Sequence, residues 1–238
     1  MYTLVYEFGA WPTAARGGGS VGLKTCQPGD LCLAETAAAL AGGALAILPT
    51  DTVYGICADV RRDEAVRAIY TAKGKGEAAP LQLLFADAAA LVRDYATMTP
   101  SATHLMSRLG PGPWTIITPA SQGWASPALA GGRTVGVRIP DAAVVQKVVT
   151  LLGAPLAASS ANRHGEPSPT TCADAISQVG AVCEIAVDAG PTPQGIDSTV
   201  IDCSTDDVRI LREGAIDRHT IARILGLSEI PVLRSVRQ

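Results

Sequence analysis

The stretch PTDTVYG at Pro49–Gly55 follows directly on the apolar run GGALAIL at Gly42–Leu48. The apolar run has the length and composition of a buried strand. A turn that only joined this strand to the next would not need a proline, two threonines, an aspartate and a tyrosine. We therefore expect the end of this strand to contribute to a polar site whose other parts lie elsewhere in the chain.

The composition is that of a globular protein with one large domain or two small ones. Of the 238 residues, 47% are hydrophobic, which excludes a disordered chain, and the net charge is −3. This acidic balance disfavours a protein that coats nucleic acid, but a local basic pocket is compatible with it. No apolar run is long enough to span a membrane. We expect a cytoplasmic protein with no membrane contact.

The six cysteines show no C-x-x-C pair and no zinc-ligand spacing with the histidines. Several lie in apolar runs, as in GICADV and AVCEIAV. Together with a chain of this length and no secretion signal, this pattern predicts buried, reduced thiols and not a disulfide scaffold. The six are Cys26, Cys32, Cys57, Cys172, Cys183 and Cys203.

Strand-like apolar runs alternate with helical patterns along most of the chain, which predicts an α/β fold with a largely buried sheet. Asp30 and Asp217 are expected helix N-caps. Helices are expected at residues 30–43, 63–72, 87–96, 141–153, 171–180 and 217–226. Strands are expected at residues 44–50, 80–87, 113–120, 134–140, 154–162, 183–190, 198–204 and 208–214.

The chain shows no internal repeat and no domain linker, which favours a single main domain. We expect this domain at residues 31–228. Residues 1–30, rich in Gly, Pro and Thr, are expected to form an N-terminal extension with a short strand at residues 2–8, and residues 229–238 a C-terminal tail.

Several predicted strands end in polar clusters, namely LPTDTVYG, VGVRIP, LAASSANRHGEP, QGIDSTV and ILREG. Ligands of open α/β sheets bind at strand ends, and these groups suit an anionic, hydroxyl-bearing small molecule. Taken alone, SSAN is equally typical of a turn with a helix cap, and TAKGKG of a solvated helix end. Arg138 inside the apolar VGVRIP requires an anionic partner, either an internal ion pair or a ligand carboxylate or phosphate.

Seven stretches together resemble the YrdC-type threonylcarbamoyl-adenylate synthases, in their order and approximate spacing. They are PTDTVYG, AKGKGEAAPL, GPWTIITPA, GVRIP, SSANRHGEPSPTT, GPTPQGIDSTVID and ILREGAI. The resemblance as a whole covers about residue 31 to about residue 226. The resemblance is to the single-domain form of the family. It implies one twisted mixed-sheet α/β domain, with helices packed around the sheet and a concave, positively charged cavity.

The resemblance also implies a reaction, in which L-threonine, bicarbonate and ATP with Mg²⁺ give threonylcarbamoyl-AMP and pyrophosphate. A separate transferase complex then places the threonylcarbamoyl group on tRNA, so that this chain itself would make at most weak RNA contact. This reaction requires no side-chain nucleophile, and no metal-ligating residue is expected. The implied threonine-binding residues are Thr52, Tyr54, Arg138 and Ser198, and the implied ATP-binding residues are Lys73, Lys75, Ser160, Asn162 and Arg212.

The chain departs from the family pattern at a few positions. Lys75 stands where the family commonly has arginine, which keeps the charge but loses the bidentate fork. Gly76 and Leu84 replace a common proline and histidine, and Asp197 replaces a glutamate. These changes bear on catalytic efficiency and substrate choice, and they leave the expected fold unchanged.

Two other functions are compatible with such a cavity. One is a carbamoyl-adenylate enzyme with another acceptor, and the other is an RNA-binding or ribosome-assembly module. An RNA cleft needs cations along an extended groove, whereas this sequence offers one arginine in an apolar run close to hydroxyls.

Overall fold

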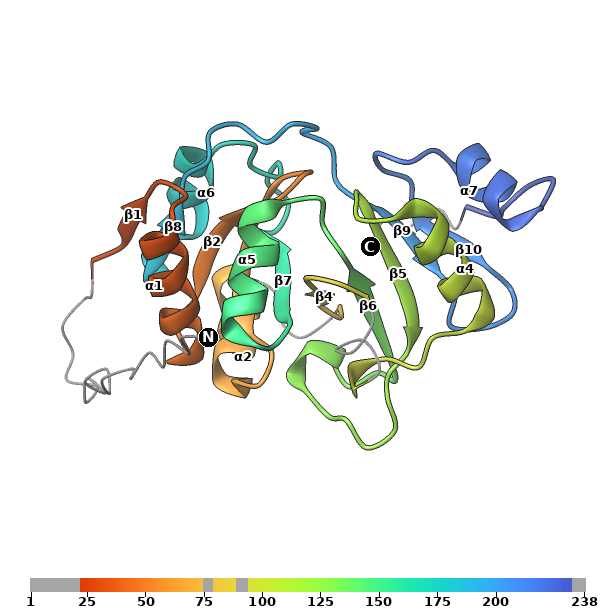
Figure 1. Cartoon of the computed structure of the whole chain (residues 1–238), viewed down its shortest axis with the longest axis horizontal. Coiled ribbons are helices and arrows are strands. Elements are labelled where there is room, and N and C mark those ends of the chain that lie inside the picture. Colours follow the sequence, from red (N-terminus) through yellow and green to blue (C-terminus); the bar gives the residue numbers. More distant parts are fainter. Residues whose placement is uncertain (1–21, 75–78, 89–93, 233–238) are drawn as a thin grey trace, which may run out of the picture.

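The computed structural model describes residues 22–74, 79–88 and 94–232. In this part of the chain the strands form a single mixed sheet in the order β1-β8-β2-β3-β7-β4-β6-β5-β9-β10 (Figure 1). The strands are β1 (Lys24–Cys26), β2 (Ala46–Pro49), β3 (Tyr54–Asp59), β4 (Gln82–Leu84), β5 (Trp114–Pro119), β6 (Thr134–Arg138), β7 (Leu156–Ser160), β8 (Ile185–Val187), β9 (Thr199–Asp202) and β10 (Arg209–Arg212). The predicted α/β fold with one mixed sheet is therefore confirmed.

Helices cover this sheet and leave the ends of several strands open. They are α1 (Asp30–Ala41), α2 (Asp63–Ala72), α4 (Pro100–Leu109), α5 (Ala143–Leu152), α6 (Cys172–Val179) and α7 (Arg218–Leu225). Two 3-10 turns lie at Pro127–Leu129 and Gly180–Val182. None of the helices in the described ranges is long and apolar enough to cross a membrane.

The sheet is buried on both faces over β2, β3, β7 and β8, which explains why these strands read as continuous apolar runs. On β3, Ile56 and Ala58 belong to the larger core, to which α2, α4, α6 and α7 contribute. Cys57 points the other way, into the smaller core beneath α1 and α5. Figure 1 shows α1 and α5 side by side over one part of the sheet.

Three elements were not predicted from the sequence. Strand β3 begins at Tyr54, inside the stretch that was expected to be a polar turn, and pairs antiparallel with β2 and β7. Strand β1 lies within the expected N-terminal extension and pairs parallel with β8. Helix α4 has clear boundary signals: the Thr99 side chain accepts a hydrogen bond from the Ala102 amide, and Gly110 ends the helix with a positive φ.

The ends of the other helices agree closely with the sequence, with one correction. The Asp217 side chain caps α7 by accepting from the Thr220 amide, as predicted. The N-cap of α1 is Gly29, and Asp30 is the first helical residue. Its carboxylate therefore lies in the first turn, where negative charge complements the helix dipole. The strand expected at residues 2–8 and the centre of the helix expected at 87–96 lie outside the described residues.

The expectation of six reduced cysteines is wrong for two of them. Cys26 and Cys32 form a disulfide with a Cα–Cα distance of 6.1 Å. Cys26 ends β1 and Cys32 lies in the first turn of α1, so the short turn between them brings the two thiols together. A six-residue spacing is not a recognised motif and gave no signal in the sequence. The other four cysteines are free and buried, as predicted.

Gly214, just after β10, fixes the position of the segment that precedes β9. A Cβ atom at Gly214 would overlap the carbonyl oxygen of Asp197 and stand 2.6 Å from the carbonyl carbon of Ser198. The Gly214 amide also donates to the Thr199 hydroxyl at 3.0 Å. Only glycine permits this close approach, which holds Asp197 and Ser198 beside the end of β10.

We predict that Gly214→Ala lowers the free energy of unfolding by about 1–3 kcal/mol, because an added methyl group must displace backbone atoms. Urea denaturation measures the change. Gly22→Ala is the matched control, since a Cβ atom there meets nothing within 4 Å. Equal stability of the two variants would contradict the close packing of Gly214.

Candidate functional site

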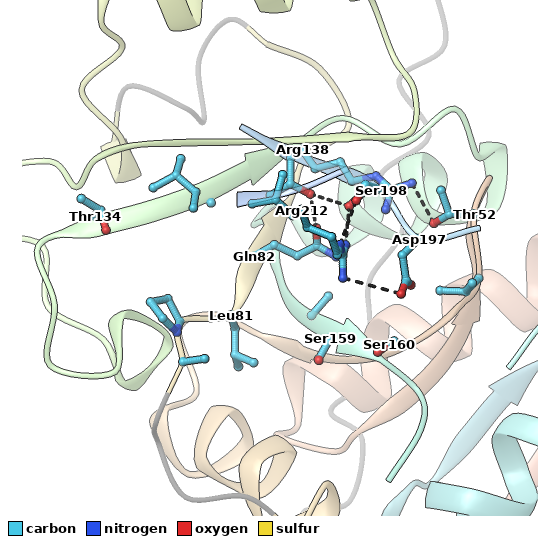
Figure 2. Close-up of a pocket in the computed structure, with 18 residues that line it drawn as sticks. Thr52, Leu81, Gln82, Thr134, Arg138, Ser159, Ser160, Asp197, Ser198 and Arg212 are labelled. Carbon is cyan, nitrogen blue, oxygen red and sulfur yellow. Dashed lines mark hydrogen bonds and ion pairs between the residues drawn. The ribbon is translucent and has the colours of Figure 1, made fainter. Parts of the chain in front are cut away.

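A cavity of about 310 Å³ lies against one face of the sheet, where alternate side chains of β5 and β6 line it together with residues of β4, β7, β9 and β10. Its volume is at the lower end of the range for small-molecule sites. Figure 2 shows Arg138, Ser198 and Arg212 converging on it, with Ser159 and Ser160 opposite them in this view. It is lined by Thr52, Val53, Ala79, Pro80, Leu81, Gln82, Thr115, Ile117, Thr134, Gly136, Arg138, Ala158, Ser159, Ser160, Asp197, Ser198, Val200 and Arg212.

The polar side chains of the turn after β2 bond partly to the turn itself and partly to a distant strand. The Thr50 hydroxyl accepts from the backbone amides of Thr52 at 3.1 Å and Val53 at 3.2 Å, and it lies 2.7 Å from the carbonyl oxygen of Val53. This local network replaces backbone pairing in the turn. It leaves the side chains of Asp51 and Thr52 to make contacts with a distant strand.

That contact is a buried ion pair with Arg138, at the end of β6. Nη2 of Arg138 donates to Oδ1 of Asp51 at 2.6 Å and to the Thr52 hydroxyl at 3.1 Å, and Nε donates to the Gly112 carbonyl oxygen at 3.2 Å. The side chains of Arg138 and Asp51 are 2% and 4% exposed. Burial lowers the pKa of Arg138, and the Asp51 carboxylate opposes that shift. The sequence predicted that Arg138 has either an internal ion pair or a ligand anion as its partner, and the structure shows the internal ion pair.

The guanidinium of Arg138 nevertheless borders the cavity. Among the described residues, none accepts a hydrogen bond from its Nη1 atom. Arg138 therefore has donor capacity for an anion in the cavity, while Asp51 fixes its orientation.

A directed chain of hydrogen bonds crosses the cavity wall. Nη2 of Arg212 donates to the Ser198 hydroxyl at 3.1 Å, which lies 2.9 Å from the Thr115 hydroxyl. Thr115 in turn donates to Oε1 of Gln82 at 2.7 Å. The Thr115 hydroxyl donates its only hydrogen to Gln82, so the hydrogen between Ser198 and Thr115 must come from the Ser198 hydroxyl. Ser198 can then only accept a further hydrogen bond, so a ligand beside it must present a donor.

Arg212 lies at the exposed side of the cavity, with its side chain 47% accessible. Its Nε donates to the Ser198 carbonyl oxygen at 3.0 Å, and Nη1 lies 3.6 Å from the Asp197 carboxylate. The Ser168 hydroxyl donates to the same carboxylate. The two arginines are close enough for the charge of Arg212 to contribute to the lowered pKa of Arg138. The cavity therefore has two cationic groups at different depths.

Lys73, Ser160 and Asn162 are brought together, as the resemblance implied, beside the end of β7. Nζ of Lys73 donates to the carbonyl oxygens of Ser160 at 2.7 Å and Asn162 at 2.8 Å, and to Oδ1 of Asn162 at 3.0 Å. Of these three residues, only Ser160 lines the cavity. Lys75 lies outside the described residues.

Tyr54 is not placed in the cavity, although it was expected on its floor. Its side chain is fully buried in the larger core. Its hydroxyl donates to the Gly190 carbonyl oxygen at 2.7 Å and accepts from the Ala189 amide at 3.3 Å. Burial raises its pKa to about 12. Tyr54 follows Thr52 by two residues, but the chain has already entered β3, and the side chain anchors the loop after β8.

Polar residues of the cavity that were not among the predicted site residues include Gln82, Thr115, Thr134 and Ser159. Gln82 and Thr115 are isolated polar side chains inside the apolar runs PLQLLF and PWTIIT. Such a residue in a buried strand needs a partner, and this signal was available.

No protein side chain in the cavity is a candidate nucleophile of the thiol or imidazole type. None of the cavity-lining residues is cysteine or histidine. Burial raises the pKa of Cys172 to about 11 and that of Cys203 to about 12, so these thiols stay protonated near neutral pH. Among the described residues, no three histidine, cysteine or acidic side chains form a group that could hold a metal ion.

Comparison with known proteins places this architecture in a family. Residues 38–214 match the family model Sua5/YciO/YrdC, described as "Telomere recombination". A threonylcarbamoyl-AMP synthase of Bacillus subtilis is 35% identical over 198 residues, which cover 83% of this chain and 57% of that protein. A putative threonylcarbamoyl-AMP synthase of Mycobacterium leprae is 35% identical, over 82% of this chain and 88% of that protein.

Solved structures agree with the sequence comparison. Sua5 of P. abyssi, complexed with L-threonine, superposes with a TM-score of 0.82 at 30% identity, covering 89% of this chain and 62% of that one. YciO of E. coli has a TM-score of 0.71 at 20% identity, covering 82% of this chain and 96% of that one, and shows the fold alone. The chain belongs to the Sua5/YciO/YrdC family. It spans little more than half the length of the B. subtilis relative.

We predict that Asp51→Asn lowers the free energy of unfolding by about 3–5 kcal/mol, because it leaves the buried charge of Arg138 without its counter-ion. The matched control is Asp207→Asn, whose partner Arg209 lies 3.5 Å away in an exposed pair. That change should alter stability by about 1 kcal/mol or less. Denaturant unfolding of both variants measures the difference. Similar losses in the two variants would show that the Asp51–Arg138 pair is not a structural requirement.

Proposed function

We propose that the chain forms threonylcarbamoyl-AMP and pyrophosphate from L-threonine, bicarbonate and ATP. The observation that carries this proposal is the buried Arg138, oriented by Asp51 and bordering a cavity lined with hydroxyl groups. Membership of a family whose relatives carry the name threonylcarbamoyl-AMP synthase supports it.

Arg138 and Thr52 form the amino-acid end of the site. The threonine carboxylate meets Nη1 of Arg138, a charge-assisted contact that is strong in a buried setting. The Ser198 hydroxyl already donates its hydrogen to Thr115, so it accepts a hydrogen bond from a donor of the substrate, such as the threonine hydroxyl. In this assignment Arg138, the deeper of the two cationic groups, binds threonine, the smaller of the two substrates.

Arg212 and Ser160 form the nucleotide end within the cavity. Lys73 and Asn162, which hydrogen-bond to Ser160, support it from outside the cavity lining, and Lys75 follows Lys73 closely in sequence. ATP and the carbamate formed from threonine both carry net negative charge, and two unit charges about 4 Å apart repel each other by roughly 4 kcal/mol at an effective dielectric constant of 20. Fixed cations on both sides of the cavity offset that repulsion and hold the reactants in line. When bound with ATP, Mg²⁺ neutralises phosphate charge. Asp197, the one carboxylate among the described lining residues, fits an ion that needs one or two carboxylates.

The chemistry needs no protein nucleophile. The threonine amine attacks the carbon of bicarbonate, and water leaves to give a carbamate. A carbamate oxygen then attacks the α-phosphorus of ATP, the bond to the bridging oxygen breaks, and pyrophosphate leaves. Arg212 stabilises the charge that develops on the phosphoryl oxygens.

The product is an activated group that a second enzyme must use. We propose that a separate threonylcarbamoyl transferase complex takes it up for the modification of adenosine in tRNA, and that this chain makes little RNA contact of its own. The compact cavity with two arginines supports an enzyme over an RNA-binding module, which requires cations along an extended groove.

We predict that L-threonine supports pyrophosphate release from ATP and bicarbonate at least about a hundredfold better than L-valine at limiting amino acid. The two are nearly isosteric, but valine leaves the polar groups of the site unpaired. L-serine, which keeps the hydroxyl and lacks the methyl group, is the control and should lose only about tenfold or somewhat more. Release is measured with a coupled pyrophosphatase assay, and the product is identified by mass spectrometry. Equal rates with threonine and valine would contradict the proposed function.

A further inference from the structure

Gln82 on β4 is the last member of the hydrogen-bonded chain in the cavity wall. Its neighbours Leu81 and Leu83 are buried, whereas its own side chain is half-buried and lines the cavity. An apolar residue would pack at this position without adding polar groups that need partners. The presence of a glutamine therefore needs a reason, and its contact with Thr115 supplies one.

This contact passes over an intervening strand. In the sheet β6 lies between β4 and β5, and Gly136 of β6 is the direct partner of Gln82. A Cβ atom at Gly136 would stand 3.1 Å from the methyl carbon of Thr115 and 3.6 Å from Cβ of Gln82. Because Gly136 has no side chain, the side chains of Gln82 and Thr115 can meet above it, at 2.7 Å. The glycine provides the space that this hydrogen bond needs.

The hydrogen bond to Gln82 decides how the two neighbouring hydroxyl groups act. The Thr115 hydroxyl contacts both Oε1 of Gln82 and the Ser198 hydroxyl, and it has only one hydrogen to donate. If that hydrogen pointed to Ser198, the oxygens of Thr115 and Gln82 would face each other without a hydrogen between them. Thr115 and Ser198 are both buried, where an unmade hydrogen bond is costly.

One acceptor position on Ser198 is left over by this arrangement. A hydroxyl oxygen has one hydrogen and two lone pairs. The hydrogen of Ser198 goes to Thr115, and one lone pair accepts from Nη2 of Arg212 at 3.1 Å. The second lone pair is available to a ligand, because Ser198 lines the cavity.

We propose that Gln82 is a positioning residue that makes the cavity selective for amino acids whose side chain carries a hydrogen-bond donor. This inference rests on the proposed function and concerns the selectivity of the same site. Gln82 acts through Thr115 and Ser198, by keeping the Ser198 hydrogen away from the ligand. A hydroxyl group on Cβ of the ligand donates to Ser198, whereas an ether oxygen there would meet a lone pair and is rejected.

The test compares L-threonine with its constitutional isomer O-methyl-L-serine. Both carry an oxygen on Cβ, but only the threonine oxygen has a hydrogen to donate. Their dissociation constants are measured by isothermal titration calorimetry of the full chain, at millimolar ligand and without ATP or bicarbonate. In the wild type we expect O-methyl-L-serine to bind at least about tenfold more weakly than L-threonine.

Two substitutions of Gln82 separate its acceptor oxygen from its bulk. Gln82→Met removes the acceptor, so that Thr115 can donate to Ser198 and the Ser198 hydrogen becomes available to an ether oxygen. The ratio of the two dissociation constants should then fall by about tenfold. Gln82→Glu is the matched control, since its carboxylate still accepts from Thr115. Its added negative charge weakens both ligands, but the ratio should stay within about threefold of the wild type.

A third variant keeps the test decisive if Gln82→Met does not fold. Thr115→Val removes the hydroxyl that receives the Ser198 hydrogen, so it should lower the ratio as Gln82→Met does. The Tm of each variant shows whether it is folded. The ligands differ in the position of one methyl group, and this steric effect is common to all variants and cancels when their ratios are compared.

The outcomes separate a positioning role from a structural one. If Gln82 only supported the strand, Gln82→Met would weaken both ligands alike, and an unchanged ratio would overturn the proposal. A ratio that falls equally in Gln82→Glu would also overturn it, as would a wild-type ratio near one. The absence of L-threonine binding to the wild type would instead contradict the proposed function, and this inference with it.

Discussion

The buried ion pair between Asp51 and Arg138 is the interaction on which the rest of the site depends. It joins the turn after β2 to the end of β6, two parts of the sheet that are separated by β3, β7 and β4. Removing two charges from water costs several kcal/mol each, and a buried pair recovers this only with good geometry and further hydrogen bonds. Here Thr52 and Gly112 supply those bonds. Stability alone does not explain such an arrangement, since an apolar pair of similar volume is often as stable. An oriented cation at a cavity wall does explain it.

The other polar groups of the cavity are ordered by the direction of their hydrogen bonds. The chain from Arg212 through Ser198 and Thr115 to Gln82 leaves Ser198 as an acceptor only. Gly214 holds that segment in place by a contact that admits no side chain. The result is a cavity with an anion receptor at depth, an acceptor beside it and a second cation at the exposed side. This division suits two reactants that each carry an anionic group and must be brought together, one small and hydroxylated and the other large.

Much of the fold could be predicted from the sequence, because the strands that are buried on both faces give long apolar runs and because helices begin at clear caps, as α7 does at Asp217. Strand β3 was missed although GICADV is an apolar run of strand length, because the strand begins at Tyr54, within a stretch that reads as a polar turn. Arg138, Thr52, Ser198 and Arg212, four of the residues that the resemblance implied, line one cavity. The resemblance did not indicate the partner Asp51 or the burial of Tyr54, because both depend on contacts between distant strands. The Cys26–Cys32 disulfide was missed for lack of a recognisable spacing.

The most direct test of the central claim is the dissociation constant of L-threonine, measured by isothermal titration calorimetry for the wild type, Arg138→Lys and Arg212→Lys. Lysine keeps the positive charge but cannot bind Asp51 and a ligand carboxylate with one rigid fork. The account predicts that Arg138→Lys weakens L-threonine binding by about tenfold or more, while Arg212→Lys leaves it within about threefold of the wild type. Unchanged affinity in Arg138→Lys, or a larger loss in Arg212→Lys, would show that the buried guanidinium is a structural element and not the receptor for the amino acid.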